Sequence, residues 1–260
     1  MITVVPFEPR RFRSTAVHYH ARPAYSPRLI ARVAELCRLT PSDRLLDLGC
    51  GIGPLAIAFR PYVGSVLAVD PEPEMLARAR TEAAARGAEI EFRAGSSADL
   101  DLELGRFKAV TIGRAFHWMD RVETLRRLDG MIDACGAIVL FSDSQPKLPE
   151  NSWLKEYRAI RERYAGPASW RGPEWIRHEA VLLDSPFACL ESVSVIERRS
   201  ASAEDLVHRA LSHSVTSADR LGEAAAAAFV SEVRAYVESQ AKEGLVTEIV
   251  ETTALIARRS

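Results

Sequence analysis

The pattern of hydrophobic and polar positions in the first half of the chain changes repeatedly between the spacing of helices and that of buried strands. Residues 29–37 are apolar at helical spacing and end at the Thr-Pro-Ser-Asp turn of residues 40–43. Residues 44–48 form a short apolar run before glycines, which is typical of a strand buried on both faces. Further runs predict strands at 65–70, 90–93, 109–112 and 137–141, and helices at 54–59, 74–86 and 122–134. Strands that alternate with helices form right-handed βαβ units, so the pattern predicts a Rossmann-like, doubly wound, mostly parallel α/β sheet.

The second half of the chain has a different composition and periodicity. The segment at 166–175 is rich in Gly, Pro and Trp, and the alanine run at 224–228 indicates a tightly packed helix rather than a linker. Helices are expected at 153–164, 203–212 and 219–240. We also expect a helix and then a strand that ends at residue 196, and a further strand at 246–258. Because no repeat and no long linker interrupts the chain, we expect one structural domain. Its core with an N-terminal arm would be residues 1–145, and residues 146–260 would form a helical cap plus C-terminal strands of the same sheet.

The composition excludes several classes of protein. Of the 260 residues, 47% are hydrophobic and 27% are charged, which is ordinary for a globular protein and unlike fibrous or disordered chains. The 34 basic residues balance 35 acidic ones to a net charge of −1, so we expect no nucleic-acid partner. No apolar stretch approaches the roughly 18 residues that cross a bilayer, so we expect no membrane association either.

The cysteines indicate free thiols in a reducing compartment. Cys37, Cys50, Cys135 and Cys189 lie far apart, with no C-x-x-C pair and no histidines at metal-ligand spacing. The apolar run at residues 2–7 is too short for a signal peptide, contains a proline and precedes its basic residues. We therefore expect a cytoplasmic protein that binds no metal.

A glycine-rich loop follows the first expected strand. Residues 47–53 read Asp-Leu-Gly-Cys-Gly-Ile-Gly, at the point where open α/β sheets bind their ligands. Glycines let backbone N–H groups approach a ligand with no Cβ in the way. Asp70 ends the second expected strand, where a carboxylate can accept both hydroxyls of a ribose. The two features predict a nucleoside site, although a glycine-rich turn without a ligand would have the same local sequence.

Two residues separate this loop from the dinucleotide fingerprint of nicotinamide and flavin enzymes. Pro54 stands where that G-x-G-x-x-G pattern needs its third glycine. Asp47 would be poorly placed beside a pyrophosphate, but it suits a cationic amino group or its ordered waters. Both departures favour a nucleoside that carries a positive charge and no phosphate.

These segments resemble the class I S-adenosylmethionine-dependent methyltransferases that act on small molecules. Residues 45–53 look like the first motif of that family, and residues 69–71 with Met75 look like the second. Residues 95–100 are similar to the segment that borders the adenine, and residues 113–118 are similar to the loop after the fourth strand. The resemblance implies S-adenosylmethionine as the cofactor.

The resemblance also implies which residues bind that cofactor. Gly49 and Gly51 would face its methionine part, and Asp70 would bind its ribose. Ser97 would meet the adenine edge through its backbone, with Ser96 available for the exocyclic amine, although many relatives carry a carboxylate at that position. The expected set is Tyr19, Arg22, Asp47, Gly49, Cys50, Gly51, Asp70, Pro71, Met75, Ser96, Ser97 and Arg114.

The segment at residues 19–25 is similar to an arm that closes over the cofactor in this family. Arg22 is a candidate for the methionine carboxylate, because an arginine binds a carboxylate through two hydrogen bonds. The alternative is a helix-entry turn with an exposed charge. Tyr19 and Tyr25 either line the pocket or fix the arm to the core, and the side chain of Arg114 could equally be a solvated surface charge.

Methyl transfer from a sulfonium is an in-line displacement that depends mainly on positioning and on excluding water. His117 is the best candidate for a general base, because an imidazole pKa of about 6.5 leaves it mostly neutral near pH 7. A structural histidine is the alternative. Phe116 and Trp118 could form an aromatic wall around substrate or sulfonium, or could simply pack in the core. Tyr25 and His213 complete the expected substrate set, and the candidate lining residues of the cap are Trp153, Trp170 and Trp175.

The sequence thus predicts a cytoplasmic enzyme that methylates nitrogen or oxygen of a small molecule, with a secondary metabolite such as an amino sugar antibiotic intermediate as the expected acceptor. Metal-dependent methylation is disfavoured because Asp143 lacks a companion ligand. A Rossmann oxidoreductase and a catalytically silent regulatory protein that keeps the fold are the alternatives.

Overall fold

A seven-stranded sheet forms the centre of the protein. The computed structural model describes residues 13–165 and 176–260. Five neighbouring strands are parallel and two C-terminal strands join them antiparallel, as expected for a doubly wound sheet with a closing hairpin. In spatial order the strands are β3 (Glu91–Ala94), β2 (Ser65–Asp70), β1 (Arg44–Leu48), β4 (Phe107–Gly113), β5 (Ile132–Ser144), β7 (Leu245–Arg258) and β6 (Cys189–Ser202).

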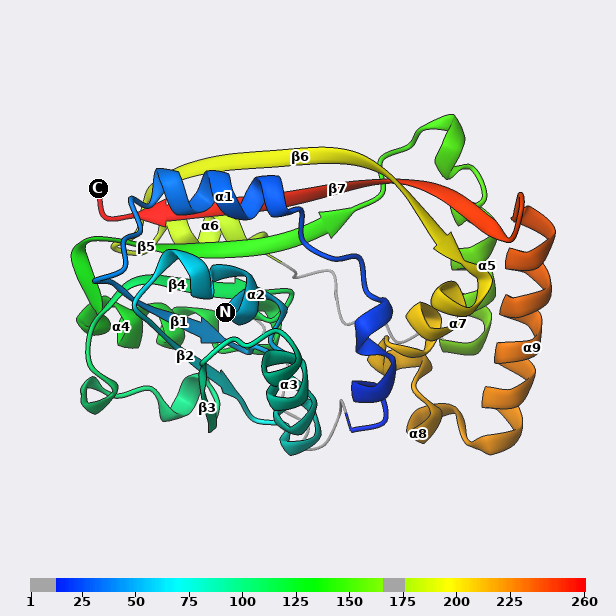
Figure 1. Cartoon of the computed structure of the whole chain (residues 1–260), viewed down its shortest axis with the longest axis horizontal. Helices are drawn as coiled ribbons and strands as arrows, with labels where there is room; N and C mark the ends of the chain where they lie inside the picture. The colour runs from blue at the N-terminus through cyan, green and yellow to red at the C-terminus, as the bar shows by residue number, and fades with distance from the viewer. Residues whose placement is uncertain (1–12, 166–175) are drawn as a thin grey trace.

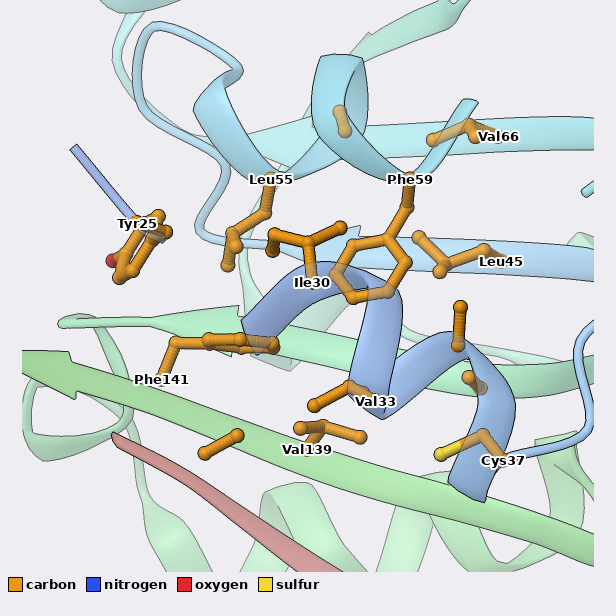
Figure 2. Packing of buried hydrophobic residues seen from close by; sticks show 14 of the residues in the cluster. Tyr25, Ile30, Val33, Cys37, Leu45, Leu55, Phe59, Val66, Val139 and Phe141 are labelled. Atoms are coloured by element: carbon orange, nitrogen blue, oxygen red, sulfur yellow. The ribbon is translucent and has the colours of Figure 1, made fainter. Parts of the chain in front are cut away.

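Helices cover both faces of the sheet. One face packs against α1 (Pro27–Leu36), α2 (Pro54–Phe59) and α3 (Pro73–Ala85), and the other packs against α4 (Arg121–Met131) and α6 (His178–Leu183). Figure 2 shows the first of these cores, in which aromatic rings from α2, β5 and the segment before α1 meet. The short 3-10 helices of the core are η2 (Arg60–Tyr62), η3 (Ser97–Asp99), η4 (Leu102–Leu104) and η5 (Phe116–Trp118).

A helical cap sits at the far end of the hairpin formed by β6 and β7. Residues 251–257 of β7 pair with β5, whereas residues 245–250 pair with β6 alone, so the hairpin extends beyond the rest of the sheet (Figure 1). The cap has its own hydrophobic core, formed mainly by α5, α7 and α9. Its helices are η6 (Pro149–Asn151), α5 (Leu154–Ala165), α7 (Ala203–Leu211), η7 (Ser214–Thr216), α8 (Ala218–Leu221) and α9 (Glu223–Gln240).

The N-terminal arm lies between core and cap. Its 3-10 helix η1 (Ala16–Ala21) contacts α3 on the core side and α7 on the cap side. Figure 1 shows it in this position, below the hairpin of β6 and β7. The arm therefore borders the space in front of the carboxyl ends of the parallel strands.

The structure confirms the fold class, and the expected parallel strands at 44–48, 65–70, 90–93, 109–112 and 137–141 are β1, β2, β3, β4 and β5, with β1 and β2 at their expected bounds. Four expectations are wrong. The strand expected to end at residue 196 continues to Ser202, where it pairs with Leu245 of β7. The helix expected at 122–134 ends at Met131, because the buried, β-branched Ile132 pairs with Phe107 of β4. The helix expected at 219–240 breaks at Gly222, whose φ of 78° with ψ of 162° is open to glycine alone. The alanine run at 224–228 is helical but mostly exposed, not tightly packed.

Further expectations concern thiols, metals, membranes and residues outside the described ranges. All four cysteines are free, as predicted. Over residues 13–165 and 176–260, no three His, Cys, Asp or Glu side chains are grouped to hold a metal ion. No helix in the same ranges has the length and apolar character to cross a membrane. The expectations for residues 2–7 and 166–175 lie outside the described residues.

Candidate functional site

The glycine loop adopts a conformation that depends on glycine at several positions. It joins β1 to α2 at the carboxyl edge of the sheet, and Gly49, Gly51 and Gly53 have φ of 70°, 55° and 81°. A Cβ on Gly49 would lie 2.6 Å from the Cβ of Ala115, in the loop that follows β4. The glycine loop and the loop after β4 are therefore packed too closely for any residue larger than glycine at position 49.

Asp47 lies behind this loop and not on its surface. Its side chain accepts hydrogen bonds from the Thr111 hydroxyl (2.8 Å) and from the amide of Ala56 (3.0 Å), and the residue is 1% exposed. Burial raises the pKa of Asp47 to about 7, although both hydrogen bonds act in the opposite direction. In place of the expected contact with a ligand amino group, we assign Asp47 the role of joining β1, β4 and α2 behind the loop.

Asp70 brings a carboxylate to the front of the loop. Its Oδ2 accepts from the amide of Gly51 (2.8 Å) and its Oδ1 accepts from the amide of Glu72 (2.9 Å). Burial raises the pKa of Asp70, and the two amide hydrogen bonds partly offset that rise. Each carboxylate oxygen keeps a second lone pair, so the group can still accept two hydroxyl hydrogen bonds.

The expected adenine segment forms a capping box. The Ser96 hydroxyl donates to Oδ2 of Asp99 (2.8 Å) and accepts from the amide of Ala98 (3.2 Å), at the start of η3. The Ser96 hydroxyl keeps one lone pair beyond these two bonds, so its contact with an exocyclic amine stays a prediction. Asp99, which sequence reasoning missed, supplies the acidic group nearby, and the hydrogen bonds from Ser96 lower its pKa. The Ser-x-x-Asp spacing was the signal that could have found it. Ser97 is half-buried beside it.

The arm brings Tyr19 and Arg22 over the glycine loop. A Cβ on Gly51 would lie 3.7 Å from Cε1 of Tyr19, and the Arg22 guanidinium lies 5.5 Å from the centre of the Tyr19 ring. Arg22 donates from Nη2 to the carbonyl of Ser212 in the cap (3.1 Å). Its Nε is buried and has no hydrogen-bond partner in the described chain. Arg22 is thus not a fully exposed charge at a helix entry.

Other residues of the expected cofactor set lie beside or beneath the loop. Cys50 is buried. Met75 packs under the arm against Ala16 and Ile52, so it supports the arm from within. Pro71 is exposed at the end of β2.

Arg114 is held in the interior rather than solvated at the surface. It has a φ of 56°, an unusual value for a residue with a side chain, at the end of β4. Its guanidinium forms an ion pair with Asp143, donates to the carbonyl of Pro23 and stacks 4.5 Å from the centre of the Tyr25 ring. Tyr25 itself packs edge-to-face on Phe141 in the core, as Figure 2 shows, so its ring fixes the arm to the core.

The Phe-His-Trp segment is divided between core and surface. Phe116 is 2% exposed and packs in the core, which corrects its expected role as a wall of the substrate site. His117 and Trp118 are half-buried, with ring centres 4.6 Å apart. The His117 ring also stacks over His178, at 6.5 Å. His117 remains in a position to meet a ligand at this edge.

His213 lies deep between arm and cap, among arginines. Burial and then the positive charges of Arg22, Arg161, Arg114 and Arg209 hold its pKa well below the usual value. Arg161 and Arg209 could not be found from the sequence, because only the packing of α5 and α7 brings them to His213. Of the cap tryptophans, Trp153 has a structural role, since it is 6% exposed and donates to the carbonyl of Thr247. Trp170 and Trp175 lie outside the described residues.

A separate groove runs between residues 20–28 of the arm and residues 196–201 of β6. It contains no residue of the glycine loop and neither Asp70 nor His117, although Arg22 borders it. We therefore place the candidate site at the carboxyl edge of the sheet, where the loop, Asp70 and the arm come together.

The central part of the chain is similar to known methyltransferases. Residues 45–135 match the model of a family described as a methyltransferase domain. A demethylmenaquinone methyltransferase of Thermus thermophilus is 31% identical over 135 residues, which cover 51% of this chain and 60% of that protein. The chain spans less than two thirds of the length of this and the next two curated relatives that it matches.

Solved structures share the fold across nearly the whole chain. A putative type II methyltransferase of Anaeromyxobacter dehalogenans superposes with a TM-score of 0.66 at 17% identity, over 92% of this chain and 97% of that one. A methyltransferase of Thiobacillus denitrificans, solved with S-adenosylhomocysteine, superposes with a TM-score of 0.54 at 16% identity, over 98% of this chain and 100% of that one. The likeness therefore includes the cap as well as the core.

Proposed function

Since the chain carries a methyltransferase domain on the class I methyltransferase fold, we propose that it transfers a methyl group from S-adenosylmethionine to a small molecule. The observation that carries the proposal is the carboxylate of Asp70, which is held on the amide of Gly51 where β1 and β2 end. A glycine loop of this shape beside an acidic strand end suits a nucleoside without a pyrophosphate.

The residues present suit this cofactor. Asp70 has acceptor capacity left for the two ribose hydroxyls, and Gly51 leaves space below Tyr19 because it has no side chain. The buried Nε of Arg22 is a donor without a partner in the described chain, and we assign it to the methionine carboxylate. We assign the adenine edge to the backbone of Ser97.

When bound, the cofactor supplies a methyl group activated by a sulfonium. The chain's own contribution is to orient the acceptor and to exclude water, which together account for most of the acceleration that such displacements need. The arm is suited to exclude water, because Tyr19 lies over the loop and Arg22 is hydrogen-bonded to the cap. We assign to His117 the proton that an amine or hydroxyl acceptor loses.

The proposal also covers the methyl acceptor and the cellular compartment. We propose nitrogen or oxygen of a secondary metabolite, with an amino sugar antibiotic intermediate as the first class to screen. The cap is the natural place for acceptor choice, since it encloses the site from the side opposite the core. The free cysteines support a reducing, cytoplasmic setting.

Two measurements test the function. Calorimetry with S-adenosylhomocysteine should give binding that Asp70→Ala weakens by about tenfold or more, since two charge-assisted hydrogen bonds are lost, while the exposed Asp101→Ala has no effect. A screen of amine and hydroxyl metabolites, read by mass, should then find an acceptor. Binding of a nicotinamide cofactor instead, or of neither ligand, would contradict the proposal.

A pH–rate profile tests the assignment of His117. His117→Gln should lower kcat by about 10²- to 10⁴-fold near neutral pH and remove the limb of the profile that a neutral imidazole produces. Unchanged turnover would leave positioning as the whole mechanism and remove His117 from the reaction.

A further inference from the structure

A cluster of cations lies between the arm and the cap, where Arg22 of the arm acts on Arg161 of α5 and both act on His213 after α7. We use the term arginine recess for the place where these three side chains meet. Arg22 donates to the carbonyl of Ser212, which places it beside His213. Helix α5 packs against η7, the turn that follows His213, and this contact brings Arg161 to the same space. Three cationic or titratable groups from three separate elements therefore converge.

Arg161 has the features of a ligand-binding group without its ligand. Its Nε is buried, and no hydrogen bond or ion pair joins Arg161 to another side chain in residues 13–165 and 176–260. Burial, together with the charges of Arg22 and Arg158, lowers the pKa of Arg161 to about 10. Arg161 is half-buried as a whole, but a buried polar atom of a cation without a partner is costly, so it usually marks a functional position.

The charges around the arginine recess do not balance. Asp143 is paired with Arg114, and Glu248 is paired with Arg209. The charge of Arg22 acts on Arg161, and each of the two has a buried Nε with no acceptor in residues 13–165 and 176–260. The other titratable groups that act on them are Tyr19, Tyr25, Tyr157 and the exposed Glu162. S-adenosylmethionine brings a single carboxylate, which the proposed function gives to Arg22, so one cation remains.

We propose that the methyl acceptor carries an anionic group, a carboxylate or a phosphate, which binds in the arginine recess between Arg161 and His213. The inference rests on the proposed function, because it assigns the second anion to the acceptor. An anion there satisfies the orphaned guanidinium of Arg161 and accepts a hydrogen bond from the imidazole of His213. It anchors the acceptor from the cap side, opposite the loop that holds the cofactor.

The test measures anion binding to the full chain saturated with S-adenosylhomocysteine. The probes are malonate, inorganic phosphate and the neutral malonamide, and whichever anion binds more tightly identifies carboxylate or phosphate as the preferred group. Arg161→Gln should weaken the preferred anion by about tenfold or more, and Arg161→Lys should restore part of the affinity. Arg158→Gln is the matched control, since Arg158 is exposed on the same helix and bonded to Gln145. Malonamide should not bind.

A second readout does not depend on affinity. The imidazole pKa of His213, followed by NMR, should rise when the anion binds, because the anion offsets the charges of Arg22 and Arg161. In Arg161→Gln the pKa of His213 without the anion should be higher than in the wild type, and adding the anion should raise it by less. If Arg161→Gln does not fold correctly, it should lose S-adenosylhomocysteine binding. In that case the comparison of the His213 titration between Arg161→Lys and the wild type decides whether Arg161 binds the anion.

Each other outcome overturns the inference. Equal anion affinity in Arg161→Gln and Arg158→Gln, or no anion binding to the wild type at millimolar concentration, removes the site. Weaker S-adenosylhomocysteine binding in both Arg161→Gln and Arg161→Lys assigns Arg161 to the cofactor instead. Failure of the wild type to bind S-adenosylhomocysteine overturns the proposed function itself, which distinguishes that failure from loss of anion binding alone.

Discussion

At the scale of single residues, two glycines with the same backbone strain allow the ligand role of the loop to be separated from stability. Gly51 has a φ of 55° and lies below Tyr19, whereas Gly87 has a φ of 62° and no atom within 4 Å of an added Cβ. Alanine at either position should cost about 1 kcal/mol of unfolding free energy through left-handed backbone strain. Only Gly51→Ala fills space in front of the loop, so it alone should weaken S-adenosylhomocysteine, as measured by calorimetry. Equal affinities in the two variants would show that the loop is only a turn.

A second prediction at this scale concerns the pH dependence of stability. Because the pKa of Asp47 is raised to about 7 in the folded chain, its proton stabilises the fold at low pH, and this contribution is lost as pH rises through 7. Asp47→Asn keeps a hydrogen-bonding group for Thr111 and Ala56 without the charge. Between pH 4.5 and 7.5 the wild type should lose about 3 kcal/mol of unfolding free energy relative to Asp47→Asn. Urea unfolding at several pH values measures the difference.

The exposed Glu89→Gln serves as the control for Asp47, since it removes one carboxylate with no buried partner. Its urea midpoint should follow that of the wild type at every pH. If Asp47→Asn behaves in the same way as Glu89→Gln, the buried carboxyl group does not govern the pH dependence.

At the scale of elements, the contact between arm and cap depends on a neutral His18. Nδ1 of His18 in η1 lies 2.9 Å from Nδ1 of His208 in α7, and the ring of His20 lies 5.2 Å from that of His208. Burial and these two neighbours lower the pKa of His18, although Glu204 and Asp205 of α7 offer some compensation for positive charge. The docked arm is therefore stabilised above the usual pKa of 6.5, and this stabilisation is lost as pH falls below it.

We expect acidification from pH 7.5 to 5.5 to release the arm. The protection factors of residues 13–25, which are corrected for the intrinsic pH dependence of amide exchange, should fall several-fold over this interval in the wild type, since His18 takes up a proton. His18→Gln should remove most of this change, because glutamine can still bond to His208 without a charge. The protection factors of α4, on the core side, are the internal control. An arm with the same protection factors at both pH values would contradict this account.

Most elements of the core could be predicted from the sequence, whereas the position of Arg161 could not. The strands β1, β2, β4 and β5 were predictable because a strand buried on both faces is continuously apolar, and the glycine loop was predictable from its position after β1. The capping box of Ser96 could also have been read from spacing. Arg161 could not be recognised as a site residue, because an arginine on an amphipathic helix looks the same in the sequence as a surface charge. Only the packing of α5 on η7 removes it from solvent.

At the scale of the whole molecule, the cap is an insertion carried by one long hairpin. Residues 245–250 of β7 and their partners in β6 lie beyond the reach of β5, and α7, α8 and α9 connect their ends (Figure 1). Few bonds therefore fix the cap relative to the core. Those that do are concentrated at the arm, which is bound to the cap through Arg22 and to the core through the Tyr25 ring and Met75. The position of the arginine recess thus depends on these contacts.

A buried ion pair joins Arg209 of the cap to Glu248 of the hairpin. Arg209 of α7 donates through both terminal nitrogens to Glu248 of β7 (2.6 and 2.9 Å), and its Nε donates to the carbonyl of Ala21 in the arm. Glu248→Gln leaves the buried guanidinium uncompensated and should cost about 3 kcal/mol or more of unfolding free energy. The measurement is the urea midpoint of the variant against that of the wild type.

An exposed ion pair on the same hairpin provides the control. Arg198 of β6 donates to Glu150 (2.8 Å) in solvent, so Glu150→Gln should leave the midpoint close to that of the wild type. Replacing both buried partners, as Arg209→Met with Glu248→Leu, should regain most of the lost stability, because no unpaired charge remains. That double variant still lacks the hydrogen bond to Ala21, so its arm should exchange faster than that of the wild type at pH 7.5. If Glu248→Gln is as stable as Glu150→Gln, the cap is held to the hairpin by its apolar core alone.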